Sequence, residues 1–110
     1  MSKSKIIKAI KFLEECLKEK RLNLKKIILF GSQITGKATE ESDIDIVIIS
    51  EDFKGKDIFE RAELTKEAEI MTIKRFMIPL DIITLTPEEF QSETSLIAEY
   101  AKKGEVLFAA

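Results

Sequence analysis

The sequence predicts an α/β (α+β) fold, in which a small mixed sheet of three or four strands is flanked by helices. Short apolar runs bounded by turn residues, which are typical of strands, alternate with longer segments whose apolar residues recur every three or four positions, as in amphipathic helices. No repeat, low-complexity tract or interior linker divides the 110 residues. Both kinds of element must therefore share one core, and we expect residues 1–110 to form a single layered domain.

The first half of the chain is expected to supply one helix and two strands. The helix covers residues 5–20, with an apolar stripe formed by Ile6, Ile10, Leu13 and Leu17. The apolar run 26–30 predicts a buried strand that stops at Gly31, and the polar segment 33–42 predicts a loop or a short helix. The run 44–49 is apolar on both faces, which favours a central strand of the sheet.

The second half of the chain is expected to supply two or three helices and one or two strands. Residues 58–76 form a charged helix whose expected buried face holds Leu64, Ala68 and Met71. Pro79 ends this helix before the strand 80–85. The run Thr86-Pro87-Glu88-Glu89 then predicts a helix start with a capping box. The remaining expected elements are a helix over 95–103, its end at Gly104, and a short edge strand over 106–108.

Composition excludes several classes of protein. The chain has no histidine, which rules out Ser-His-Asp and Cys-His catalysis and histidine-containing zinc sites. Its one cysteine, Cys16, cannot form an internal disulfide and is expected as a small core or boundary side chain. The N-terminal segment alternates charged and apolar residues, unlike a signal peptide or a membrane span, so we expect a cytoplasmic protein. The net charge of −2, with both signs interspersed, argues against direct nucleic-acid binding.

Three aspartates are placed to meet at one surface of the sheet. Asp43 and Asp45 are two residues apart at the start of a strand, so their side chains project from the same face. Asp81 occupies the matching place in the strand 80–85. If these strands are neighbours, three carboxylates converge with no cation in either strand, and such a cluster is costly unless a metal binds. Oxygen-only ligands favour Mg²⁺ or Mn²⁺ over zinc.

Gly31 and Ser32 are placed to bind phosphate. A strand that ends in glycine, which has no Cβ, lets the backbone approach a phosphate closely, and the exposed amides and the Ser32 hydroxyl can donate to its oxygens. Neither Gly-Ser nor the two spaced aspartates is specific alone, because ordinary turns and solvated strand ends contain both. Their joint spacing is the informative feature.

That spacing resembles a known motif. Gly31-Ser32, ten intervening residues and Asp43-Ile44-Asp45 reproduce the pattern G-S-x10-D-x-D of the DNA polymerase beta-like nucleotidyltransferase superfamily. Gly36 inside the loop and Ser42 before the first aspartate also match, and Asp81 follows on a later strand as the third acid. The resemblance covers nearly the whole chain, and the chain length is similar to that of the minimal nucleotidyltransferases, the MNT proteins.

The resemblance implies the nucleotidyltransferase fold and Mg²⁺-dependent transfer of a nucleoside monophosphate from an NTP, here AMP from ATP, to a hydroxyl. The implied site comprises the catalytic and metal-binding Asp43, Asp45 and Asp81 and the nucleotide-binding Gly31, Ser32, Gly36, Lys37 and Ser42. Members of the minimal group are typically encoded beside a helical HEPN protein, the toxin of a toxin–antitoxin pair, so the resemblance implies a HEPN-type partner whose tyrosine accepts AMP. A chain this short has no domain to grip an acceptor, which favours a partner or a homo-oligomer.

One departure from the family leaves alternatives open. Family loops commonly carry basic residues after the serine, whereas this chain has Gln33-Ile34-Thr35, followed by Gly36 and Lys37. The first interpretation is an active nucleotidyltransferase. The second is a catalytically weak or inactive MNT-fold binding module, an antitoxin that neutralises its partner by occlusion. A third, a transferase for a small hydroxylated molecule, has no support beyond the resemblance.

Overall fold

The computed structural model describes residues 2–30, 43–92 and 96–110 of the chain. In chain order the elements are α1 (Lys3–Glu19), β1 (Leu24–Phe30), β2 (Ile44–Ser50), the short 3-10 helix η1 (Glu51–Phe53), α3 (Ile58–Phe76), β3 (Leu80–Leu85), α4 (Pro87–Gln91), α5 (Leu96–Lys102) and β4 (Glu105–Ala109). The segment 33–42, expected to be a loop or a short helix, lies outside the described residues. No helix within the described ranges is both long enough and apolar enough to cross a membrane.

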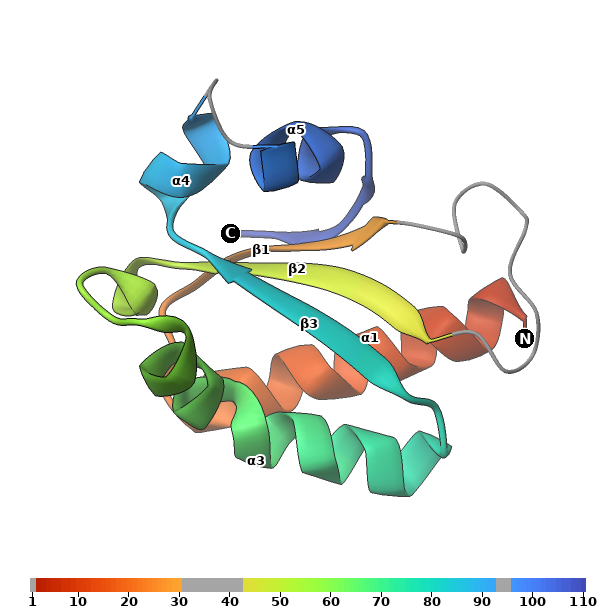
Figure 1. Ribbon diagram of the computed structural model, residues 1–110. Coiled ribbons are helices and arrows are strands. Elements are labelled where there is room, and N and C mark those ends of the chain that lie inside the picture. The colour runs from red at the N-terminus through yellow and green to blue at the C-terminus, as the bar shows by residue number, and fades with distance from the viewer. Residues whose placement is uncertain (1, 31–42, 93–95) are drawn as a thin grey trace.

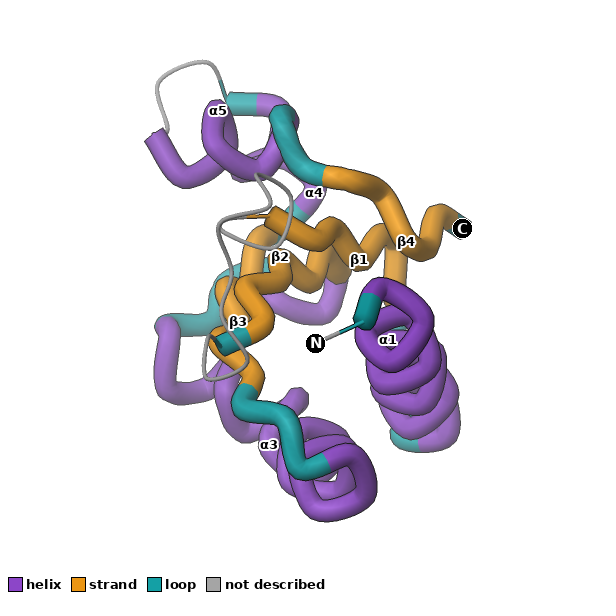
Figure 2. Tube along the Cα trace, turned by 90° about the vertical axis from the view of Figure 1, so that its right-hand side faces the viewer, coloured by secondary structure: helices purple, strands orange, loops and turns teal. Residues whose placement is uncertain are grey.

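A mixed sheet with the strand order β3-β2-β1-β4 forms the centre of the molecule. β1 runs antiparallel to β2 and to β4, whereas β2 and β3 are parallel. α1 and α3 cover one face of the sheet, and α4 and α5 lie on the other (Figure 1; Figure 2). The predicted fold class is confirmed. The run 44–49 forms β2, one of the two inner strands, as expected, and the expected strand near the C-terminus is β4, at one edge.

Apolar side chains fill two clusters, one on each face of the sheet. Ile46 and Ile48 belong to the cluster shared with α1, in which Cys16 is buried as expected. Val47 and Ile49 belong to the cluster on the opposite face, which includes residues of α4 and α5. Because side chains alternate along a strand, β2 contributes to both clusters. Its apolar character on both faces follows from this central position.

Helix α3 buries only part of the expected stripe of Leu64, Ala68 and Met71. Ala68 is fully buried and Leu64 is partly buried against the core, whereas Met71 is 42% exposed. The other buried residues of α3 are Thr65 and Thr72. The Thr72 hydroxyl donates to the Ala68 carbonyl at 2.8 Å, and the Thr65 hydroxyl bonds to a carbonyl of the preceding turn. These hydroxyls are satisfied within the helix, so the threonines can be buried, which a hydrophobicity pattern does not reveal.

Two capping boxes fix the starts of α3 and α4. The Thr86 hydroxyl accepts from the Glu89 amide at 3.0 Å, and the Glu89 carboxylate accepts from the Thr86 amide at 2.8 Å. The predicted helix start after β3 is therefore confirmed. Asp57 and Glu60 form the same reciprocal pair at the start of α3. Each box satisfies amides that a helix N-terminus otherwise leaves without an intrahelical partner.

Gly104, which was expected to end the last helix, packs directly against β1. Its amide donates to the Ala101 carbonyl at 2.9 Å. A Cβ at position 104 would lie 2.5 Å from Cγ2 of Ile28 and 2.6 Å from the backbone oxygen of Leu29. The oxygen belongs to an inner strand and cannot rotate away, so we expect Gly104→Ala to lower the free energy of unfolding by about 1–3 kcal/mol.

Chemical denaturation measures this loss. Lys103→Ala, a change at the exposed neighbouring position, is the control and is expected to stay within about 0.5 kcal/mol of the wild type. Equal stability of the two variants would contradict the close approach of Gly104 to β1.

Candidate active site

Asp45 and Asp81 lie directly opposite each other on adjacent parallel strands. In the register of β2 and β3, Asp45 is paired with Asp81, and each is the second residue of its strand. Val47, two residues after Asp45, packs in the cluster on the face of α4 and α5, so alternation directs the Asp45 side chain to the same face. Both carboxylates therefore lie on this face, at the end of the sheet away from α4 (Figure 1). The condition for convergence, that the strands 44–49 and 80–85 are neighbours, is met.

The end of β1 lies beside the same site. Phe30, the last residue of β1, is paired with Asp45 on β2. The residues expected to bind the nucleotide, Gly31, Ser32, Gly36, Lys37 and Ser42, all lie outside the described residues. Their role stays a prediction from the sequence.

Asp45 stands in an electrostatically unfavourable place for a carboxylate. Burial raises the pKa of Asp45 above its ordinary value of 3.8, and the charge of Asp81, a side-chain hydrogen bond with Asp81 and the charge of Asp43 raise it further. Both burial and nearby like charges disfavour the ionised form. None of the ion pairs in the described part of the chain includes one of these three aspartates. The site therefore concentrates negative charge that no described cation offsets.

Asp43 completes the expected set only in part. It is exposed and immediately precedes β2, and its charge acts on Asp45. Across residues 2–30, 43–92 and 96–110, no group of three or more cysteine or acidic side chains is arranged to hold a metal ion. Carboxylates repel one another when no cation lies between them, so their full convergence is not expected of the protein alone. As donors, the adjacent Asp45 and Asp81 are hard oxygen ligands without a counter-charge, which fits Mg²⁺ or Mn²⁺.

A fourth carboxylate, Glu69 on α3, is affected by the charge of Asp81 and was not predicted from the sequence. Burial raises the pKa of Glu69 above its ordinary value of 4.5, and the charge of Asp81 adds to the effect. The sequence offered one sign of this burial: Glu69 follows Ala68, which is buried, and so lies at the border of the packed face of α3. The facing strand could not be known without the fold.

The arginines of α3 are engaged with other groups. Arg61 donates to the Glu89 carboxylate at 2.7 Å. The guanidinium of Arg75 lies over the rings of Phe12 and Phe76, at 4.9 Å and 5.9 Å from their centroids. Within the described residues, no arginine therefore forms an ion pair with the aspartates.

Known proteins resemble this chain in sequence and in structure. A putative protein adenylyltransferase of Methanocaldococcus jannaschii is 58% identical over 45 residues, which are 40% of this chain and 45% of that protein, so the match spans less than half of the relative. The crystal structure of a toxin–antitoxin with AMP-PNP superposes with a TM-score of 0.61 at 22% identity, covering 100% of this chain and 75% of the other. A mutant of the toxin–antitoxin MntA-HpeT gives the same values.

A further crystal structure, of a putative nucleotidyltransferase from Sulfolobus solfataricus, matches with a TM-score of 0.53 at 23% identity and covers 99% of this chain and 90% of the other. These structural likenesses establish the fold. In sequence, residues 9–104 match the family described as a nucleotidyltransferase domain, which is most of the chain. With Asp45 and Asp81 in register at the start of β2 and β3, the chain belongs to the nucleotidyltransferase domain family.

Proposed function

We propose that this nucleotidyltransferase transfers AMP from ATP, with Mg²⁺ or Mn²⁺, to a hydroxyl on a partner protein. The observation that carries the proposal is the direct pairing of Asp45 with Asp81, next to Asp43, in a region without a described counter-charge. Such a region is suited to divalent cations and, with them, to a triphosphate. Bound metal would supply activation of the hydroxyl and charge stabilisation at the phosphates, held by Asp43, Asp45 and Asp81.

The residues of the chain have separable roles in this reaction. The acceptor oxygen forms a bond to the α-phosphorus of ATP, the bond from that phosphorus to the bridging oxygen breaks, and pyrophosphate leaves. Asp81 receives the proton of the acceptor hydroxyl, directly or through water. Asp45 is less suited to that task, because its side chain is partly buried whereas that of Asp81 is exposed. Gly31 and Ser32 would hold the triphosphate by their amides and the serine hydroxyl.

The acceptor is proposed to be a protein. The relative from Methanocaldococcus jannaschii is named a putative protein adenylyltransferase, and two structurally similar proteins are parts of toxin–antitoxin pairs. These names support a toxin partner, and the resemblance to MNT proteins suggests a HEPN-type toxin modified on a tyrosine. Binding of that partner would supply the acceptor.

One alternative has an observation in its favour. The uncharged Gln33-Ile34-Thr35 stands where family loops commonly carry basic residues. An MNT-fold module that neutralises its partner by occlusion needs neither a triphosphate nor a metal. It requires only a stable surface.

Label transfer separates the two functions. The chain is incubated with ATP labelled at the α-phosphate, Mg²⁺ and the protein encoded beside it, and the labelled tyrosine is located by peptide mapping. We expect covalent label on the partner that depends on Mg²⁺. Tight binding of the partner without any label, at saturating ATP, would favour the occlusion module.

A further inference from the structure

The outer edge of β3 is open. β3 is the last strand in the order β3-β2-β1-β4, so one side of its backbone has no neighbouring strand among the described residues. Arg61 Nη1 donates to the Thr84 carbonyl at 3.3 Å, which shows that Thr84 turns its backbone groups away from β2. Backbone direction alternates along a strand, so the amide and carbonyl of Ile82 and the amide of Thr84 also point to the open edge.

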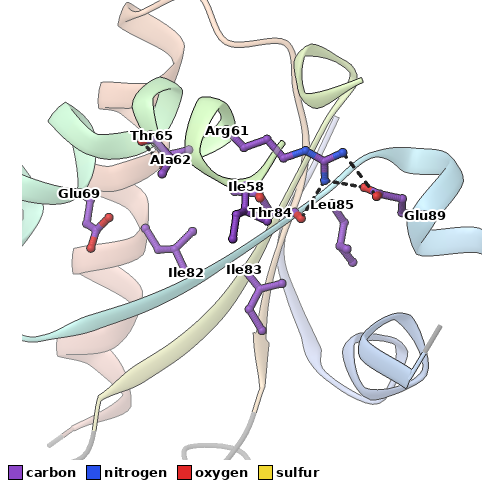
Figure 3. A pocket seen from close by; sticks show the side chains of 10 residues that line it. All are labelled: Ile58, Arg61, Ala62, Thr65, Glu69, Ile82, Ile83, Thr84, Leu85 and Glu89. Atoms are coloured by element: carbon purple, nitrogen blue, oxygen red, sulfur yellow. Dashed lines mark hydrogen bonds and ion pairs between the residues drawn. The ribbon is translucent and has the colours of Figure 1, made fainter. Parts of the chain in front are cut away.

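A groove of about 430 Å³ follows this edge. One wall is the run of β3 from Ile82 to Leu85, whose side chains point to alternate faces of the sheet (Figure 3). Four consecutive residues of one strand can line a single groove only if it lies against the strand's edge. The other wall is a stripe of α3 formed by Ile58, Ala62, Thr65 and Glu69.

The two ends of the groove differ in chemistry. Glu69 lies at the end near the start of β3, where Asp81 precedes Ile82, and Arg61 and Glu89 close the other end with their ion pair (Figure 3). The Arg61 side chain is only 11% exposed, so the closed end is firmly held. Between the ends, apolar side chains dominate, and Ile58 at the rim is 70% exposed.

We propose that this groove binds an extended segment of the acceptor polypeptide, which adds to β3 as a further strand. The outward amide and carbonyl of Ile82 and the outward amide of Thr84 are the groups that such strand addition uses, and the apolar wall accepts alternate side chains. The acidic end is complementary to a basic side chain opposite Glu69. Asp81 lies on β3 directly before Ile82, so a segment paired with β3 in this groove brings its hydroxyl to Asp45 and Asp81. This last step rests on the proposed function.

Strand addition is tested with a synthetic peptide in which valine alternates with lysine around a central tyrosine. Amide exchange of the protein is followed by NMR while the peptide is added. We expect slower exchange of the Ile82 and Thr84 amides, and no such effect from the same peptide N-methylated at alternate residues, which keeps its side chains and loses strand pairing. Unchanged exchange at both amides with the unmodified peptide at saturating concentration would overturn the proposal.

Paired variants test the groove itself. Ile58 lines it, whereas the adjacent Phe59, 77% exposed, does not. Ile58→Asp is expected to weaken peptide affinity about tenfold or more, and Phe59→Asp to leave it unchanged. Both changes put the same charge in the first turn of α3, where an acid is favourable, so the folding effects are matched. Equal loss of affinity in the two variants would contradict binding in the groove.

Thr84→Pro removes an outward amide and leaves the ladder to β2 intact, since proline is tolerated on edge strands. It is expected to abolish strand addition with unchanged circular dichroism, and retained peptide affinity in a folded variant would count against the proposal.

Label transfer is measured in parallel. Slower exchange of the Ile82 and Thr84 amides without transfer of labelled AMP supports strand addition in the groove and counts against the proposed transferase activity. Equal labelling of the peptide and its N-methylated form retains the transferase and overturns strand addition.

Discussion

Replacing Asp81 with asparagine is expected to lower AMP transfer by about 10³-fold or more. The carboxylate at this position is proposed both to hold metal and to receive the acceptor proton, and the amide can do neither well. Metal catalysis contributes several kcal/mol to transition-state stabilisation, and each 1.36 kcal/mol changes the rate tenfold. The measurement is the initial rate of transfer from α-labelled ATP to the partner protein.

The control for that experiment is a second variant that removes one negative charge outside the site. Glu63→Gln also removes one negative charge, at an exposed position on α3 that does not line the groove, and it is expected to transfer at the wild-type rate. Partner binding is measured alongside, and Asp81→Asn should retain it. If Asp81→Asn and Glu63→Gln transferred AMP equally well, Asp81 would not be a catalytic residue.

Asp45→Asn is expected to change stability in opposite directions with and without metal. In EDTA the variant should melt at a higher temperature than the wild type, because the repulsion of Asp45 by Asp81 and Asp43 and the cost of burying its charge are relieved. With Mg²⁺ and a non-hydrolysable ATP analogue at about 100 times their Kd, the wild type should gain about 2.7 kcal/mol, roughly 10 °C in Tm. The variant should lose most of this gain.

The dependence of the melting temperature on pH gives an independent check in EDTA. Because the pKa values of Asp45 and Glu69 are raised in the folded protein, their contribution to stability is complete below the ordinary values of 3.8 and 4.5 and is lost as the pH rises through the raised values. Asp45→Asn should flatten this fall. A wild-type Tm that is unchanged by Mg²⁺ and nucleotide, and that depends on pH in the same way as the Tm of Asp45→Asn, would contradict a working metal site.

The two active-site strands illustrate what could be predicted from residue pattern. Period-two alternation predicted a shared face for Asp43 and Asp45. It predicted the same face for Asp81 on the condition that the two strands are neighbours. The observed pairing of Asp45 with Asp81 agrees. Local signals of this kind depend only on neighbours in the chain. The capping box at Thr86 was predictable for the same reason.

Features that depend on contacts between distant elements could not be predicted. The burial of Thr65 and Thr72 on α3 was not predicted, because their hydroxyls are satisfied inside the helix and the side chains then pack as small residues. The pKa of Glu69 is raised by burial and, to a smaller degree, by the charge of Asp81, and both depend on how α3 packs against β3 rather than on spacing within the helix. The charge pattern of α3 marks it as a surface helix and nothing more.

The sequence by itself determined the order of helices and strands, the aspartate positions and the family resemblance, because each is carried by short-range periodicity or by a motif. Only the tertiary structure decided that β3 lies at an open edge, that Arg61 turns toward Thr84 and Glu89, and that Glu69 joins the acidic end of a groove. The reason is physical. Strand order and helix placement are set by how whole apolar faces pack, and they bring together residues whose separation along the chain carries no signal of their contact.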